Sequence, residues 1–487
     1  MDFLANDNAA LDLRPGLVLG EVERALSNDT TVRTDVACLL RVGRSPEPFA
    51  EDKELEVQRL FIEDLPGSPE GAECQFTLRY RRMSRWEEEI FAGEYRTRQP
   101  AIARMYFRNG GNDLHMVDLN FWVPPFDPAQ LEGDDAERDP NEVAEERETA
   151  AILRFHLWAL ERLDDFGDGV INQVILPELW TRQVHMLPQI WATVAGFCRR
   201  SGNRFFVASG APPLSLLRDE EASRAHDEGI ELSQEELSPG ALVPWYRSEQ
   251  WQRREDVPVE VALTLDALAA TRVILARQEV TLSSIGVYWP WLRDLRGMLL
   301  PPAGAVCGVF ARSDDENGPV GVMKPPANEE VKGILDLAQH VDELPSNMLQ
   351  REAVNLLHTR VGKGVVVWGA RTLCEDPTWR FVNVRRLMGY IGKQIEFDNQ
   401  WAVFESNDES LRQRVARDVR YFLKDLWEKG ALQGEVPSEA FLVACNDENN
   451  TQAVIDQGML VVDVWVNPVQ TNEFVHLKLT YGDEVVD

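Results

Sequence analysis

Short apolar runs alternate with amphipathic stretches along most of the chain. A short apolar run bounded by turn signals predicts a strand buried on both faces, whereas apolar residues at three- and four-residue steps predict a helix. The predicted strands cover residues 35–42, 113–119, 170–176, 204–209 and 284–288, and the predicted helices cover 150–163, 185–199 and 265–278. Strand, helix and strand between 170 and 209 form a βαβ-like unit, so we expect a parallel pair in a mixed α/β fold.

The C-terminal third has the most regular pattern. Residues 365–368 and 400–404 predict strands on either side of a helix over 380–395. A longer helix is predicted over 409–429, with Asn407 or Asp408 as its N-cap and Gly430 after its last turn. Its apolar stripe consists of Leu411, Val415, Val419, Phe422, Leu423 and Leu426. Further strands are predicted at 440–445, 459–466 and 473–481, the last with the alternation of a half-exposed strand.

Polar and acidic segments separate these elements. Residues 1–30 predict an extended arm with one short strand, and residues 132–148 and 218–258 predict solvated loops. These breaks divide the chain into five expected segments, at 1–30, 31–119, 120–283, 284–470 and 471–487.

The charge balance narrows the possible partners. The chain has 81 acidic and 50 basic residues, a formal net charge of −31. Such a surface repels phosphate, which argues against nucleic acid and anionic membranes as general partners. Two interpretations remain open: the charge fits partners with basic faces or other copies of the chain, or it serves only solubility.

The cysteines and the hydropathy pattern bear on the compartment. Six cysteines are spread along the chain without a CxxC pair, which suits a reducing cytosol. The N-terminus has no pattern of a secretory signal, and no run approaches the ~18–20 apolar residues that span a bilayer. We therefore expect synthesis in the cytoplasm and a chain that stays soluble.

A search for catalytic motifs favours a structural protein. The segment 362–364 (GKG) lacks the Ser or Thr of a phosphate loop, and Lys324 stands where a calcium loop beginning at Ser313 would need Glu. The seven histidines lack metal-ligand spacing, and there is no GxSxG motif. We expect no catalytic residue, cofactor or metal.

Two features leave an enzyme open as an alternative. Carboxylates are abundant enough that some pair must lie close together, although abundance is not evidence for an acid–base pair. Trp289 and Trp291 predict either an aromatic platform for sugars or anchors of a core or interface. The alternative is a hydrolase with a carbohydrate- or peptide-binding middle domain at 120–280.

A series of short motifs runs through the last two hundred residues. The motifs are YWPWL at 288–292, LPPAG at 300–304, GVFARSD at 308–314, KPPAN at 324–328, VWGARTL at 367–373, WRFVNVRR at 379–386, VFESND at 403–408 and GALQG at 430–434. In this order the region 288–481 resembles the C-terminal region of contractile tail sheath proteins of myophages, R-type bacteriocins and extracellular contractile injection systems. Ser406 replaces the usual proline of the family, and the N-terminal arm matches only in part. These departures leave open a main sheath or a specialised copy beside the baseplate.

The resemblance implies a sheath core built from N- and C-terminal segments, an inserted middle domain and extended terminal strand arms. It implies a subunit that polymerises as stacked rings around an inner tube and contracts to drive the tube through a target envelope. Its terminal strands would pair with neighbouring copies. The implied strand residues are Leu17, Val18, Leu19, Val22, Phe474, Val475, His476, Leu477, Lys478 and Leu479.

Other residues are expected to hold the core or contact partners. Five of them form either the C-terminal core or a face between subunits: Trp368, Arg371, Trp379, Arg385 and Arg386. An internal salt bridge is the alternative for the arginines. Four cations on the helix 409–429 either contact the inner tube or lie on a merely solvated face: Arg412, Arg420, Lys424 and Lys429.

The expected partners follow from the same resemblance. They are further copies of the chain, an inner tube protein, and baseplate and tail-terminator or cap proteins. Neither nucleic acid nor direct membrane insertion is expected. A phage tail, a released extracellular particle and a membrane-tethered one all remain open, as does a baseplate-proximal or capping paralogue.

Overall fold

The computed structural model describes most of the chain between residues 32 and 469. The described ranges are 32–44, 60–61, 73–82, 98–122, 139–163, 171–227, 230–243, 245–246, 257–277, 282–316, 318–340, 342–403, 405–456 and 458–469. The strand residues expected at 17–22 and 474–479 lie outside them, as does the first half of the acidic segment 132–148.

A ten-stranded sheet forms the centre of the described structure. In spatial order its strands are β10 (Glu329–Glu330), β13 (Gly364–Val367), β12 (Asn355–Arg360), β7 (Ile285–Trp289), β6 (Phe205–Ser209), β5 (Gln173–Ile175), β1 (Val36–Arg44), β4 (Asp113–Trp122), β3 (Glu73–Arg82) and β2 (Leu60–Phe61). The strands from β12 to β4 are parallel, and antiparallel strands flank them at both ends. The mixed α/β fold and the parallel pair of β5 and β6 are as predicted.

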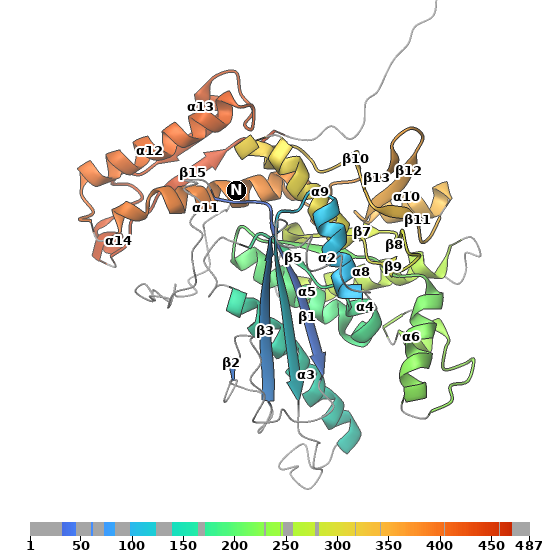
Figure 1. Ribbon diagram of the computed structural model, residues 1–487. Helices are drawn as coiled ribbons and strands as arrows, with labels where there is room; N and C mark the ends of the chain where they lie inside the picture. Colours follow the sequence, from blue (N-terminus) through green and yellow to red (C-terminus); the bar gives the residue numbers. More distant parts are fainter. Residues whose placement is uncertain are drawn as a thin grey trace, which may run out of the picture.

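Helices cover both faces of this sheet (Figure 1). One face packs against α3 (Pro140–Arg162), α5 (Leu187–Arg200) and α8 (Val259–Arg277), and the other against α2 (Arg98–Arg108) and α9 (Ala303–Glu316). Successive residues of β1 point into the two different cores. A continuous apolar run is therefore required in the central strands, because both of their faces are buried.

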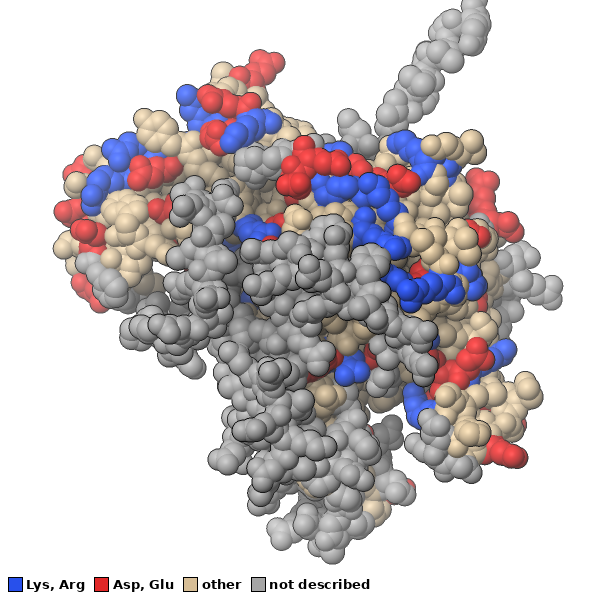
Figure 2. Space-filling view, viewed as in Figure 1, with Lys and Arg blue, Asp and Glu red and all other residues tan. Residues whose placement is uncertain are grey.

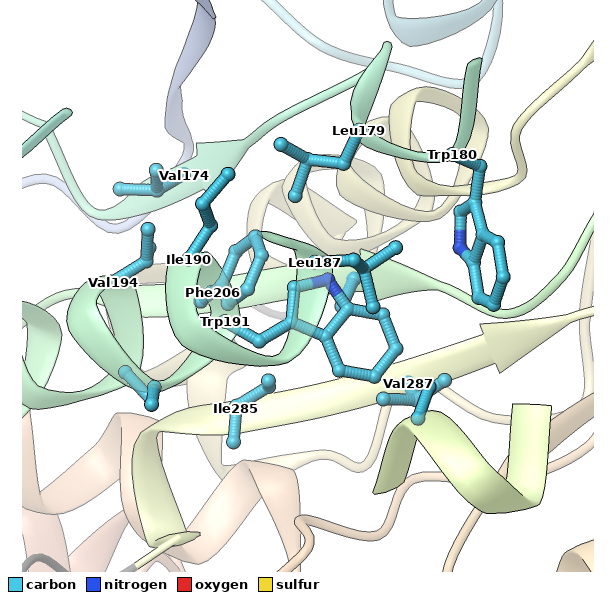
Figure 3. Close-up of a cluster of buried hydrophobic side chains, with 14 of the residues drawn as sticks. Val174, Leu179, Trp180, Leu187, Ile190, Trp191, Val194, Phe206, Ile285 and Val287 are labelled. Atoms are coloured by element: carbon cyan, nitrogen blue, oxygen red, sulfur yellow. The ribbon is translucent and has the colours of Figure 1, made fainter. Parts of the chain in front are cut away.

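Trp191 of α5 occupies the centre of the larger core (Figure 3). It is 1% exposed and lies among Ile190, Phe206, Ile285 and neighbouring aliphatic side chains. Its ring meets that of Trp180 edge to face, with centroids 6.4 Å apart. Burial of this much aromatic surface stabilises the contact between α5 and the sheet.

The tryptophans of the YWPWL motif also belong to the core. Trp289 and Trp291 are at most 1% exposed, and their indole N–H groups donate to the carbonyls of Ala211 and Gly210 at 3.0 and 2.8 Å. Rings enclosed in this way cannot form a platform for sugars. The interpretation as core anchors is correct.

Three predicted elements are different in the structure. Residues 400–403 of the predicted strand 400–404 do not form a strand: Gln400–Ala402 is a 3-10 turn, and Trp401 and Val403 are too exposed for a buried strand. Part of each predicted loop is helical, since α3 begins at Pro140 and α6 (Leu214–Asp227) covers the start of 218–258. Proline is well suited to the first helical position. Glu161 of α3 and Asp219 of α6 are exposed, whereas Phe155 and Leu216 on the same helices are buried.

The weak phosphate and calcium motifs lie in ordinary secondary structure. Gly362 and Lys363 form the turn of the β12–β13 hairpin rather than a loop before a helix, and Ser313 is inside α9. The sheet takes strands from both sides of the expected boundaries at 119 and 283. The division into segments remains a prediction.

Prediction 1 concerns the buried His156 of α3. Its Nδ1–H donates to the Ile152 carbonyl at 2.8 Å, and burial lowers its pKa to about 4. Because the unfolded chain takes up the proton at a higher pH, folding stability from the neutral ring is present above about pH 6.5 and is lost as the pH falls toward 4. His156 should thus reduce the free energy of unfolding by about 2 kcal/mol between pH 7.5 and 5.

Urea denaturation across this pH range measures the effect. The His156→Gln variant should show a flatter dependence of unfolding free energy on pH than the natural chain. His340→Gln, at a side chain that is 65% exposed, is the matched control and should keep the natural slope. An unchanged slope in His156→Gln would contradict the assignment.

Candidate assembly site

The C-terminal elements form a module beside the large sheet (Figure 1). Helices α11 (Val382–Asp398) and α12 (Glu409–Glu428) pack through a third apolar cluster that includes Tyr390, Leu411 and Val419. As predicted, Asp408 caps α12: its Oδ1 accepts the Leu411 N–H at 2.8 Å. Gly430 follows the helix with a φ of +82°, a conformation that glycine adopts without strain.

A two-stranded antiparallel sheet packs against α12. Its strands are β14 (Phe441–Ala444) and β15 (Asp463–Val466). Phe441, Val443 and Val464 face the helices, whereas the opposed pair Leu442 and Trp465 lies on the other face, 60% and 44% exposed. Two large apolar side chains facing solvent side by side are typical of a surface that another chain covers.

The hydrogen bonds of β15 lie on one side only. The Asn467 N–H donates to the Ala440 carbonyl, next to β14. On the same side, the Asn467 carbonyl accepts the Gln433 N–H, and the Val469 N–H donates to the Ala431 carbonyl. By the alternation of an antiparallel ladder, the main-chain groups of Val464 and Val466 point to the other side. No main-chain group in the described part of the chain pairs with them there.

The outer edge of β14 is partly occupied by a side chain of α12. Arg420 of α12 donates from Nη2 to the Val443 carbonyl at 3.0 Å. A side chain thus occupies a position that an added strand would need. Of the two edges, β15 is the one prepared to accept another strand.

Both ends of the described chain leave from this module. At the N-terminal end, Val32 packs against the third cluster and its N–H donates to Gln394 Oε1 at 2.7 Å. At the other end, Val469 pairs with Ala431 just after α12. The chain therefore contacts this module at both ends of its described part.

A buried ion pair fixes the root of the N-terminal arm. Arg386 of α11 binds Asp314 of α9, with Nη2 to Oδ2 at 2.5 Å, and both side chains are about 5% exposed. Arg386 also donates to the Thr34 carbonyl, and the Thr34 hydroxyl donates to Asp314. Burial raises the pKa of Asp314, and the guanidinium of Arg386 opposes that shift.

A second set of charges holds the next turn of the arm. Arg33 binds both Asp35 and Asp113, and Asp113 is the first residue of β4. The arm root is thus attached to α9, α11 and the sheet at once.

The other predicted core arginines also have internal positions. Arg385 is 6% exposed and donates from Nε to Ser284 Oγ at 3.2 Å, and burial lowers its pKa to about 10. The Arg371 side chain donates from Nη1 to the Gln350 carbonyl, and its main-chain N–H donates to Asn355 Oδ1. These contacts support the internal alternative within one subunit, with Arg386 in a salt bridge.

The two predicted tryptophans differ from each other in exposure. Trp379 is half-buried, and its carbonyl accepts the Thr372 hydroxyl. Trp368 is 40% exposed, and the guanidinium of Arg360 lies 3.6 Å above its ring. Trp368 is therefore the member of the set with surface to offer a partner.

The four cations of α12 fall into two pairs. Arg412 is 8% exposed and binds Asp447 and Asn407, and Arg420 caps β14. Lys424 and Lys429 are 53% and 42% exposed and form only surface pairs within the helix. Of the four predicted cations, Lys424 and Lys429 are thus the two that are exposed.

Neither a metal site nor a membrane span is found in the described ranges. No three His, Cys, Asp or Glu side chains are grouped so that they could hold a metal ion. None of the described helices combines the length and the apolar composition that a bilayer crossing needs.

Two family models match consecutive parts of the chain. Residues 260–373 match the phage tail sheath protein central domain, and residues 375–480 match the phage tail sheath C-terminal domain. Residues 260–373 and 375–480 are therefore similar to two consecutive domains of phage tail sheath proteins.

Curated relatives agree over a similar stretch. The tail sheath protein of Vibrio phage KVP40 is 26% identical over 186 residues, which are 38% of this chain and 26% of the relative. A putative prophage major tail sheath protein of Pseudomonas aeruginosa is 26% identical over 190 residues, 38% of this chain and 46% of the relative. The matched region thus spans less than half of each relative.

Solved structures extend the likeness of fold to almost the whole chain. A chain of the anti-feeding prophage baseplate has a TM-score of 0.56 at 20% identity and covers 96% of this chain and 100% of its own. The contracted sheath complex of the extracellular contractile injection system PVC gives 0.56 at 21% identity, with 97% and 98% covered. The architecture is that of contractile sheath subunits.

Prediction 2 tests the buried pair at the arm root. Arg386→Met leaves the Asp314 carboxylate buried without its partner and should reduce the free energy of unfolding by about 3–5 kcal/mol. Arg386→Met with Asp314→Leu removes both charges and should recover most of that loss. Chemical denaturation provides the measurement.

Arg380→Met is the control, since this exposed neighbour forms no described ion pair and should change stability by less than about 0.5 kcal/mol. A loss in Arg386→Met no larger than in the control would mean that the pair is not structural.

Proposed function

We propose that this chain is a sheath subunit of a contractile, phage-tail-like injection system, polymerising as stacked rings around an inner tube. The observation that carries the proposal is the match of two consecutive tail sheath domains over residues 260–480. The fold shared with sheath subunits over nearly the whole chain supports it. The role is mechanical and requires no catalytic residue.

Strand exchange is the proposed link between subunits. A terminal strand of a neighbouring copy, from residues 17–22 or 474–479, adds to the open edge of β15. Each main-chain hydrogen bond formed contributes about 1 kcal/mol net, and Leu442 and Trp465 gain apolar contacts. The starting points of the arm and the tail beside this module support the proposal.

Contraction would then be a rigid-body change between two packings of the lattice. The strand links stay paired while the large sheet domains move to contacts of lower free energy. Energy stored in the extended packing drives the inner tube forward. No nucleotide has to be hydrolysed at that step.

The proposed partners are other copies of the chain, an inner tube protein, and baseplate and terminator or cap proteins. Lys424 and Lys429 are the proposed tube-facing cations, because Arg412 and Arg420 are bound internally. The subunit assembles in the cytoplasm into a particle that is either released or held at a membrane. The net charge of −31 disfavours nucleic acid as a partner.

Prediction 3 is the form of the assembly. The chain co-produced with its inner tube protein should form striated tubes in negative-stain electron microscopy, some long and narrow, others short and wide. Discrete monomers or small closed oligomers in the presence of the tube protein would refute the sheath proposal.

A second candidate is a specialised subunit next to the baseplate or a cap. The fold match to a chain of the anti-feeding prophage baseplate favours it. Such a subunit should localise to one end of the particle by gold labelling, whereas a main sheath subunit labels the whole length.

Prediction 4 tests the acceptor edge. Val466→Pro removes an N–H group that points away from β14, so it should block addition of a strand and abolish tubes. Val466→Thr keeps both the N–H group and the β-branched shape, and should assemble normally. Both variants should remain folded by circular dichroism; tubes of normal yield from Val466→Pro would exclude β15 as the acceptor.

A further inference from the structure

Three cations gather where α2 meets a small antiparallel sheet. Arg108 lies in the last turn of α2, Arg296 follows β8 (Leu292–Asp294), and Lys332 precedes β11 (Ile334–Leu337). Strands β8 and β11 are antiparallel, with Asp294 opposite Ile334. The segments that contain Arg296 and Lys332 therefore lie alongside each other. We name these three residues the basic cluster. Figure 2 shows basic side chains gathered over this region of the molecule.

The basic cluster lacks internal partners. No carboxylate of the described residues forms an ion pair with any of the three, whereas neighbouring Arg312 and Lys324 both pair with Glu329. In a chain with 81 acidic residues an internal partner would be easy to supply. Unpaired cations at one place on such a chain favour an external acidic partner.

An ion pair, hydrogen bonds and close packing fix the conformation of the segments that carry the basic cluster. The buried Arg104–Asp294 ion pair, at 2.8 Å, joins α2 to β8. Asn109 binds Lys332 in both directions, accepting its N–H and donating to its carbonyl. Gly333 has a φ of +80°, and a Cβ there would lie 2.8 Å from Cδ of Arg108, so the arginine stem packs directly against the glycine. A preorganised cluster loses little entropy on binding.

A complementary surface exists elsewhere on the same chain. Helix α6 and residues 230–243, which include α7 (Pro239–Leu242), form a lobe at the side of the sheet domain (Figure 1). We name this segment the acidic lobe. Its exposed carboxylates include Asp219, Glu231 and Glu235, and none of these has a cationic partner among the described residues.

The cations of the lobe are already engaged. Arg218 donates to the Leu237 carbonyl, and Arg224 binds Glu221 and the Thr181 carbonyl. These bonds hold the lobe together and leave its outer charge negative.

We propose that the basic cluster of one copy receives the acidic lobe of the next copy. The inference rests on the proposed function, because it concerns how identical copies assemble. Two different surfaces that fit each other form a head-to-tail contact, which builds rings or open helical polymers. Since each copy carries a net charge of −31, such a local match is also needed to offset general repulsion between copies.

Charge exchange tests the proposal in tubes made by co-production with the inner tube protein. Arg296→Glu with Lys332→Glu should reduce the fraction of the chain that sediments as polymer about tenfold, because like charges then face each other. Glu231→Arg with Glu235→Arg should have a similar effect. Combining all four changes restores opposite charges across the contact and should restore polymer.

The matched control is Arg351→Glu with Arg380→Glu, which changes the net charge equally at two exposed arginines outside the cluster, and it should assemble like the natural chain. Higher salt should weaken natural assembly as the screening length shrinks. Normal assembly of both charge-reversed variants would overturn the proposal. Loss in both without recovery in the fourfold variant would overturn the pairing of cluster with lobe.

Failure of this inference can be told from failure of the proposed function. If the natural chain forms tubes but charge reversal does not affect them, only the contact is refuted. If the natural chain forms no tubes with its tube protein, the sheath proposal itself fails.

Discussion

The buried carboxylate of Asp314 constrains the arrangement of the whole molecule. A charge taken out of water must find a partner in a fixed geometry, and here Arg386 and the hydroxyl of Thr34 provide it. Those three residues belong to α9, α11 and the root of the N-terminal arm. One satisfied charge therefore joins the sheet domain, the C-terminal module and the arm, and apolar contacts accompany it, since Val32 of the arm root and Val322 after α9 both pack in the third cluster.

The Asp314–Arg386 ion pair connects two parts of different character, the large sheet domain and the C-terminal module. In the large sheet, with helices on both faces, the central strands are paired along both edges and buried on both faces. The C-terminal module is smaller, and its sheet has only two strands in the described ranges, with one edge open and two apolar side chains turned outward. An isolated two-stranded sheet is marginally stable. Its completion by a further strand is consistent with a role in assembly rather than chemistry.

The sequence predicts elements with strong periodicity and fails where short-range signals are ambiguous. The stripe of α12, with Asp408 before it and Gly430 after it, specifies that helix almost to the residue. Residues 400–404 have the apolar content of a strand, yet Gln400–Ala402 forms a 3-10 turn, and Trp401 and Val403 are too exposed to face a core. The pairing of Arg386 with Asp314 could not be read from spacing, because 72 residues separate them. Likewise, an open edge is a property of a fold and not of a local pattern.

The contact of both Val32 and Val469 with the C-terminal module has a mechanical consequence. In a lattice joined through the arm and the tail, tension between neighbours enters one copy at Val32 and leaves it near Val469. Both points contact the C-terminal module, but residues 33–35 are also bound to α9 and β4 and lead directly into β1, so part of such a load reaches the ten-stranded sheet. Hydrogen bonds along an added strand share such a load in parallel. The sheet domain and the C-terminal module would thus carry such a load together, through the bonds at the root of the arm.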